Sequence, residues 1–484
     1  MEGVTMNEVQ NAAPVAAKSK KPTEIWRYIV ALMGILGAIL IMLCIQPQGA
    51  LTAEGIKAMG VLFFMVLWWI AGICSILVTS FAGLAIMLLI KAVDITTAFS
   101  GFSDKTVVFL VFAFIIAASV SKTGLGKRLA FNMMSKVKPT FSSIMIMLSV
   151  VSLVLGAIIP SGSARTVLVC TIGMMILPIF GQNEDKMSNV GRSIFTLLGL
   201  NSYMGSTAYM TGGAAVILVV GLLEGAGITI SYLKWLLMAF PAVLIASLLL
   251  AIIIPKIYPP EVAKVDEKMF EQFKAELTSL GPMSKDEKKT AIIVGLVILC
   301  WMICDLIGYS FIIFGVMGAV FLMFPFLKVV DDKDFNKRIS WDAIYFVGVC
   351  MTLGNVLETT GVAEYLAGLA DPMLASSSIM VFCLKVWLLA TLAHLLLPSA
   401  LPAMATFIPI LIASSNSLGF DPLIPVMVFS LAYTGLFMVY QQVHAAIAYG
   451  FKQFAAEDLI KPGLTLIFIW LIITPFLTFY LSIF

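Results

Sequence analysis

The chain has 484 residues, of which 61% are hydrophobic and only 12% are charged, and its formal net charge is +3. Soluble globular proteins have about half apolar and about a quarter charged residues. This composition therefore excludes a soluble enzyme and a disordered protein, and the small net charge excludes a nucleic-acid partner. It predicts an all-α polytopic membrane protein.

The apolar runs predict about eleven transmembrane helices, because a spanning helix needs about 20 apolar residues. A polar stretch, 1–24, precedes them and is predicted as a cytoplasmic N-terminal tail, and residues 25–57 hold the first span and an outer loop. The charged segment 259–288 is predicted as a cytoplasmic linker. The eleven spans are expected at 27–45, 58–75, 76–93, 104–121, 193–223, 232–258, 289–308, 309–327, 340–357, 423–450 and 463–483.

Two further apolar blocks, 142–180 and 378–416, are too long for one helix, and each is broken near its middle. The first break reads Pro160-Ser161-Gly162-Ser163, and the second reads Pro398-Ser399-Ala400-Leu401-Pro402. Proline and small polar residues interrupt helices. Each block is therefore predicted to form a helical hairpin that returns the chain to the side it came from.

The basic residues predict the orientation. With the N-terminus inside, 24 of the 30 Lys and Arg residues fall on the cytoplasmic side and four fall outside, while Arg165 and Lys385 lie in the hairpins. This distribution satisfies the positive-inside rule. It predicts a multi-pass protein of the cytoplasmic (inner) membrane, with the C-terminus outside.

Two matching halves are indicated by the spacing of several signals. Asp104 and Asp342 each begin a span and are 238 positions apart, as are the two hairpin breaks. Residues 58–258 and 289–484 each contain five spans and one hairpin, and because five is odd the halves enter the membrane from opposite sides. The prediction is an inverted-topology repeat. Both aspartates are expected to cap helix N-termini.

The breaks are the predicted substrate site, because half-helix N-termini in secondary transporters present free N–H groups to anions. Each half also has a second interrupted helix after its hairpin, around 201–213 and 433–444. The candidate substrate-binding residues are Ser161, Gly162, Ser163, Arg165, Thr166, Ser206, Thr207, Thr211, Ser399, Ala400, Thr406, Gln441, Gln442 and His444.

Simpler interpretations compete with several of these assignments. The breaks are also consistent with plain turns, and the glycines with close helix packing. Arg165 could cap a helix end or reach the membrane surface, as Lys385 is expected to do. His394 could hydrogen-bond within its hairpin rather than touch substrate.

The sequence also argues against an enzyme. The chain lacks His-Glu-x-x-His, Gly-x-Gly-Asp and nucleotide-binding loop motifs, which argues against a membrane protease and against ATP hydrolysis. The hairpins and interrupted helices also contain no Asp or Glu, so the carboxylate relay of a cation/proton antiporter is missing. The seven cysteines all lie in apolar segments and are predicted to be small hydrophobic side chains rather than disulfides or metal ligands. No cofactor is expected, apart from sodium as a coupling ion.

With these features the chain resembles the divalent-anion:sodium symporter family, the permeases for dicarboxylates, tricarboxylates and sulfate. The resemblance covers residues 25–484 and includes the eleven spans, the two hairpins and the inverted halves. Pro160-Ser161-Gly162-Ser163-Ala164-Arg165 stands where the bacterial citrate and plant dicarboxylate exchangers have Pro-Ser-Asn-Thr-Ala-Arg. Pro398-Ser399-Ala400-Leu401 stands at the second Ser-Asn-Thr motif.

The resemblance implies a homodimer with an alternating-access mechanism of the elevator kind. In the family the tip asparagines contact substrate carboxylates and nearby backbone carbonyls hold sodium, which places possible sodium sites near Ser161, Gly162, Gly205, Ser399 and Ala400. Here the asparagines are replaced by Gly162 and Ala400, so the resemblance leaves sodium coupling open. Arg165, Gln441, Gln442 and His444 are the candidate replacement donors.

The predicted function is secondary transport of small di- or tricarboxylates or related divalent anions, by sodium symport or by anion exchange. Two alternatives remain: a permease for another inorganic or metalloid oxyanion, and a non-transporting membrane sensor derived from such a permease.

Overall fold

The computed structural model describes residues 25–159, 161–183, 185–262, 265, 267–374 and 376–484. Within these residues the chain is helical and forms no β-strand. The expected break residue Pro160 and the tail 1–24 lie outside the described residues. Ten helices in the described part are long and apolar enough to cross a membrane. The prediction of an all-α polytopic membrane protein is therefore confirmed.

The chain forms two series of helices, and the corresponding helices of the two series follow one another in the same order. The first series is α2 (Ile25–Cys44), α3 (Ala53–Ala71), α4 (Ile76–Leu89), α5 (Ile95–Ser100), η1 (Gly101–Ser103), α6 (Lys105–Thr123), α7 (Leu125–Met134), α8 (Phe141–Ile158), α9 (Gly162–Ile176), η2 (Leu177–Phe180), α10 (Asn189–Thr207), α11 (Ala214–Gly225) and α12 (Tyr232–Ile257). After the linker helix α13 (Glu267–Thr278) come α14 (Lys285–Ile303), η3 (Cys304–Ile307), α15 (Phe311–Met323), α16 (Asp332–Arg338), α17 (Trp341–Thr359), α18 (Val362–Leu374), α19 (Ile379–Leu396), α20 (Ala400–Ser417), α21 (Leu423–Ala432), η4 (Val439–Gln441), α22 (Val443–Gly450), η5 (Ala456–Leu459) and α23 (Ile460–Leu481). Apart from the extra first helix α2, the series from α3 to α12 has a counterpart for each α-helix in the series from α14 to α23.

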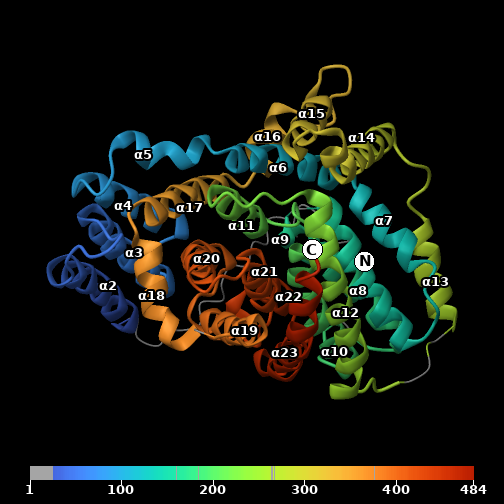
Figure 1. Cartoon of the computed structure of the whole chain (residues 1–484). Coiled ribbons are helices and arrows are strands. Elements are labelled where there is room, and N and C mark those ends of the chain that lie inside the picture. Colours follow the sequence, from blue (N-terminus) through green and yellow to red (C-terminus); the bar gives the residue numbers. More distant parts are fainter. Residues whose placement is uncertain (1–24, 160, 184, 263–264, 266, 375) are drawn as a thin grey trace.

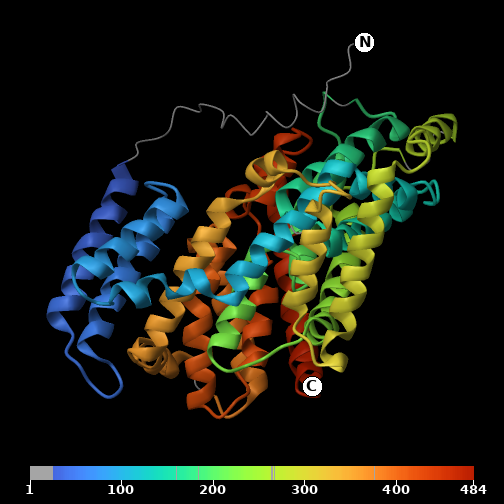
Figure 2. The same cartoon turned by 90° about the horizontal axis from the view of Figure 1, so that it is seen from above.

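The helices are arranged in space as a bundle with a side group. Figure 1 shows α2, α3 and α4 gathered at one side of the molecule and α8, α10 and α12 at the other, with α20 and α21 between them. Figure 2 shows the carboxyl end of the chain at one end of the bundle and the linker helix α13 at the other. The second helices of the two hairpins, α9 and α20, lie toward the middle of the view, whereas α8 and α19 lie nearer its rim.

Local sequence explains where the helices begin and end. Asp104 caps α6 by accepting a hydrogen bond from the backbone N–H of Thr106 at 2.7 Å, as predicted. Asp342 does not cap α17; it lies in the first turn, where a carboxylate still favours the helix dipole, and the cap position is Ser340. Gly124 and Gly361, which follow α6 and α17, both have left-handed φ angles, of 79° and 74°. The two glycines occupy corresponding positions in the two series because both turns require a left-handed residue, a conformation that favours glycine.

Several short helices were not expected. α5, α7, α13, α16 and α18 are short or amphipathic and lie in segments that the apolar runs left as loops. α16 and α17 meet at an angle of 63°. α4 and α15 have only 14 and 13 residues and are shorter than the spans predicted for them. The cysteines are all free, as predicted.

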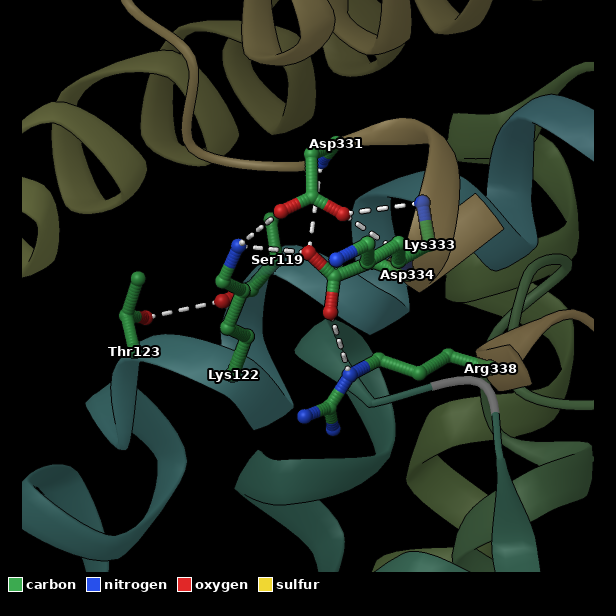
Figure 3. A network of polar contacts seen from close by, with 7 residues as sticks. All are labelled: Ser119, Lys122, Thr123, Asp331, Lys333, Asp334 and Arg338. Carbon is green, nitrogen blue, oxygen red and sulfur yellow. Dashed lines mark hydrogen bonds and ion pairs between the residues drawn. The ribbon is translucent and has the colours of Figure 1, made fainter. Parts of the chain in front are cut away.

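A network of charges joins the first series to the second at the end of α6 (Figure 3). Lys122 pairs with Asp331 and Asp334, and Arg338 donates to Asp334 at 2.9 Å. Burial alone would raise the pKa of Asp334, but hydrogen bonds from Lys122, from the Asp331 N–H and from Arg338 hold that pKa below its usual value. The backbone N–H of Asp334 lowers the pKa of Asp331 in the same way.

Candidate functional site

The two hairpin tips are the breaks between α8 and α9 and between α19 and α20. The first tip joins α8 to α9, and Ser161 caps α9 with its hydroxyl, which accepts from the Ala164 N–H at 3.4 Å. The second tip joins α19 to α20, where Ser399 stands at the cap position without a side-chain cap bond. Both predicted hairpins are therefore present. Of the two helices that follow the tips, only α9 has its N-terminus capped by the hydroxyl of its cap serine.

Arg165 is the only charged side chain at the tips within the described residues, and it is fully buried. Its Nη1 donates to the carbonyl of Ile159 at 2.9 Å, at the C-terminal end of α8. Its Nη2 donates to the Ser202 carbonyl at 2.6 Å and to the Ser206 hydroxyl, both on α10. The guanidinium therefore fixes the first tip to the interrupted helix of the same half. It does not reach the surface of the protein.

The charge of Arg165 has no counter-ion among the described residues. Its hydrogen-bond partners there are all neutral oxygens, and its Nε has none. α9, α10 and α22 contain no Asp or Glu. A buried charge without an opposite charge costs several kcal/mol. An anion bound close to the tip would remove this cost.

His444 crosses from the second half to the first tip. It lies on α22, and its ring covers Gly162 so closely that a Cβ at position 162 would overlap Nε2. The ring also stacks on Tyr203 of α10, with centroids 5.3 Å apart. Neither ring nitrogen of His444 has a hydrogen-bond partner within the described chain, and the Nε2 of the neighbouring Gln442 has none either.

The second tip is held differently, by neutral groups. The Tyr433 hydroxyl, at the end of α21, donates to the carbonyls of Leu397 and Ser399 at 2.5 and 3.2 Å. Gln441 closes the interruption after α21: its Oε1 accepts from Phe437 N–H at 2.8 Å, and its Nε2 donates to the His394 carbonyl at 3.0 Å. These contacts show Gln441 acting on the backbone rather than facing a ligand.

Other candidate residues point toward their own helices. The hydroxyls of Thr166, Thr207 and Thr406 donate to carbonyls three or four residues earlier. Gly205 packs against α8, where a Cβ would approach the Ser152 carbonyl to 3.1 Å. Ser163 is exposed at the tip, Ala400 is buried, and Thr211 lies beside Trp301 in a small, mostly apolar pocket.

Tyr203 and Tyr433 are functional candidates that the sequence analysis did not assign. Both are buried and lie next to the helix interruptions, and both contact His394: its ring is 6.1 Å from Tyr203 and 4.1 Å from Tyr433. A buried tyrosine carries a hydroxyl that needs a partner. That signal, a tyrosine beside a break in an apolar helix, could have marked them.

A separate cavity of about 540 Å³ lies between α17, α18 and α20. Its lining includes four carboxylates, and none of the residues that line it is Lys or Arg. Their negative charge repels dianions. This cavity is therefore a poor site for a dianion. The carboxylates are Asp104, Glu358, Glu364 and Asp371.

The tips offer few free oxygens for sodium. The Ile159, Leu397 and Ser399 carbonyls accept hydrogen bonds from Arg165 or Tyr433. Sodium is a hard cation that needs several oxygen ligands. The guanidinium also repels a cation at the first tip. Within the described residues no group of three His, Cys, Asp or Glu side chains could hold a metal ion.

The fold and these sites define a helical membrane transporter built around two hairpins. The chain matches the family model described as the sodium:sulfate symporter transmembrane region over residues 22–482. It belongs to this family, the divalent anion:sodium symporter family, and it is a transporter rather than an enzyme.

Similar proteins agree with this membership. A membrane protein of Cupriavidus necator is 28% identical over 411 residues, covering 81% of this chain and 79% of that protein. The L-tartrate/succinate antiporter of Escherichia coli strain K12 is 25% identical over 356 residues, covering 70% of this chain and 69% of the antiporter. The YdaH transporter of Alcanivorax borkumensis has a similar fold, with a TM-score of 0.51, 12% identity and coverage of 95% of this chain and 98% of that one.

Proposed function

We propose that this protein is a secondary transporter of small dicarboxylates in the cytoplasmic membrane, working by alternating access and by exchange of one anion for another. The observation that carries the proposal is Arg165, a buried guanidinium whose partners are all neutral oxygens. A planar, forked cation is well suited to a carboxylate. The similarity to an L-tartrate/succinate antiporter supports the same substrate class.

The proposed binding surface is the first tip together with the helix from the other half that covers it. Ser161, Ser163 and the first turn of α9 supply hydroxyls and N–H groups, and Gln442 and His444 supply side-chain nitrogens without other partners. Arg165 positions this surface and provides its charge. The second tip closes the site with neutral groups, Ser399 and Ala400.

Exchange is proposed over sodium symport because three of the described tip carbonyls already accept hydrogen bonds from Arg165 or Tyr433. A carbonyl that accepts a strong hydrogen bond is a poorer ligand for a cation. The family resemblance further suggests that the protein works as a homodimer with its N-terminus inside and its C-terminus outside.

The test is uptake of radiolabelled succinate and L-tartrate by proteoliposomes, with internal unlabelled anion, with a sodium gradient, or with neither. We expect uptake that requires internal anion and is indifferent to sodium. Uptake driven only by sodium would contradict exchange, and transport of sulfate but of neither dicarboxylate would contradict the substrate class.

Substitutions at the first tip test whether transport depends on this site. Arg165→Lys keeps the charge but loses the fork, and we expect at least about a tenfold loss of transport, since a charged hydrogen bond contributes about 1.5–3 kcal/mol and 1.4 kcal/mol is tenfold. Ser163→Ala, at an exposed position, tests the tip without affecting the core. Arg338→Lys, on α16, is the matched control and should transport normally. Normal transport by Arg165→Lys at equal expression would remove the site assignment.

A further inference from the structure

Four aromatic rings connect the two hairpin tips and end at His444. His444 stacks on Tyr203 with centroids 5.3 Å apart, Tyr203 meets His394 edge-on at 6.1 Å, and His394 stacks on Tyr433 at 4.1 Å. Tyr203 is the ring that stacks directly on His444 and holds it against the first tip. The two histidines are both buried, and both rings contact Tyr203.

The two histidines differ in what their ring nitrogens meet. Nδ1 of His394 lies 3.1 Å from the Gly435 carbonyl, and its Nε2 lies 3.4 Å from the Gln441 carbonyl. Both nitrogens of His444 lack a partner in the part of the chain that the structure describes, although the residue is only 7% exposed. A buried polar group without a partner is costly and marks a position that a ligand completes.

On the described helices that pack against His444, the charged side chains are all cations. α22 packs against α9, α10 and η4. α9 brings Arg165, whose charge acts on the ring; α10 brings the neutral Tyr203, and η4 brings Tyr440, which is largely exposed. Arg192, at the start of α10, is already paired with Asp458 at 3.0 Å.

Two positive charges in this interior would repel each other, because the Coulomb energy grows as the local dielectric falls. A guanidinium cannot give up its proton in a protein, so without an anion it is the imidazole that stays neutral. A dicarboxylate bound at the tip favours the protonated imidazole, since its two negative charges neutralise both the guanidinium and the imidazolium. Anion binding and proton binding at His444 must then favour each other to the same extent.

We propose that a dicarboxylate binding at the first hairpin tip takes up a proton on His444, so that the anion and the proton are carried together. The proton comes from the buffered solvent, which keeps the conjugate base of the buffer, and it binds the lone pair of the unprotonated ring nitrogen. The resulting imidazolium has two N–H groups, of which one donates to a carboxylate oxygen. The proposal rests on the proposed dicarboxylate function and adds the proton to its substrate.

Proton uptake on His444 determines how many protons cross the membrane with the dicarboxylate. When one dicarboxylate is exchanged for another, each carries a proton and no net proton moves. When a dicarboxylate moves without a counter-anion, one proton moves with it.

The test is titration calorimetry of the purified protein with L-tartrate and succinate, above the pH at which their own carboxylates titrate. Buffers of different ionisation enthalpy are compared, because the slope of the observed binding enthalpy against that enthalpy counts the protons taken up. We expect uptake of up to one proton per dicarboxylate in the wild type and none in His444→Gln. His394→Gln is the matched control and should keep the uptake, since both of its nitrogens face backbone carbonyls.

The outcomes are distinguishable. Binding with the same enthalpy in every buffer overturns proton uptake and leaves the dicarboxylate function standing. Proton uptake that persists in His444→Gln also overturns the assignment. No binding of either dicarboxylate overturns the proposed function itself. A second measurement needs no variant: dicarboxylate affinity of the wild type should fall as the pH rises, by up to tenfold per pH unit, and an affinity independent of pH contradicts the proposal.

Discussion

The contact between Gly162 and His444 gives the sharpest test of the site. A Cβ at position 162 would overlap Nε2 of the buried, stacked His444 ring. Adding a carbon to a packed interior costs about 1–3 kcal/mol. We therefore expect Gly162→Ala to lower the free energy of unfolding by about 1–3 kcal/mol and to reduce dicarboxylate binding, because the ring that faces the tip is displaced.

The double variant separates this steric cause from a general effect. His444→Ala loses a ring contact worth about 0.5–1.5 kcal/mol, but it opens the space that a Cβ at position 162 needs. In that background Gly162→Ala should cost less than about 0.5 kcal/mol, so the coupling energy should be about 0.5–3 kcal/mol, the range seen for residues in contact.

Unfolding in mixed detergent, followed by tryptophan fluorescence, measures all four proteins of the cycle. Gly295→Ala is the control, since a Cβ at that position in α14 meets nothing within 4 Å. It should be neutral or slightly stabilising because alanine favours helix. The reasoning is refuted if Gly162→Ala is as stable as the wild type, or if its cost is the same with and without His444.

Three further variants test the supports of the site. Gly156→Ala should destabilise the protein by about 1–3 kcal/mol, since its Cβ would lie 2.5 Å from the backbone carbonyl of Gly205; unchanged thermal unfolding would be inconsistent with the close α8–α10 packing. Tyr433→Phe leaves the Leu397 carbonyl without its donor and should cost about 1–3 kcal/mol, measured by the same unfolding assay, whereas a neutral result would show that the hydroxyl bond is not needed. The lowered pKa of Asp334 means that its ionised form stabilises the fold above the unfolded value of 3.8 and that this contribution is lost as the pH falls through the lower folded value. Asp334→Asn should remove that part of the acid sensitivity, and an acid transition identical to that of the wild type would contradict it.

Much of the fold follows from the sequence because the membrane imposes strict rules. An apolar run must be helical in lipid, and a run too long for one helix that contains proline and serine must turn. The hairpins at 142–180 and 378–416 were therefore predictable, and so was the interruption that separates α10 from α11. The short helices α5, α7, α13, α16 and α18 were not, because they lie outside the apolar core and are set by packing against neighbours.

The site was only partly predictable, for a related reason. Sequence shows that Arg165 is a charge in an apolar block, but not which carbonyls it reaches; Ile159 and Ser202 are found only once α8, α9 and α10 are packed. The pairing of Gly162 with His444 joins positions in different halves, which no local pattern connects. Asp342 had the same sequence signal as Asp104, yet it lies two residues past the cap position.

The two tips have the same layout but different chemistry. In the proposed function, this difference determines how a dianion binds. At the first tip the carbonyl is held by the charged Arg165, and a histidine of the other half covers the glycine. At the second tip the corresponding carbonyls are held by the neutral Tyr433 hydroxyl, and the residue after Ser399 is alanine. One guanidinium balances only one carboxylate, so the second negative charge needs another cation close by. Within the described part of both hairpins and both interruptions, only His444 can become that cation and still face the first tip.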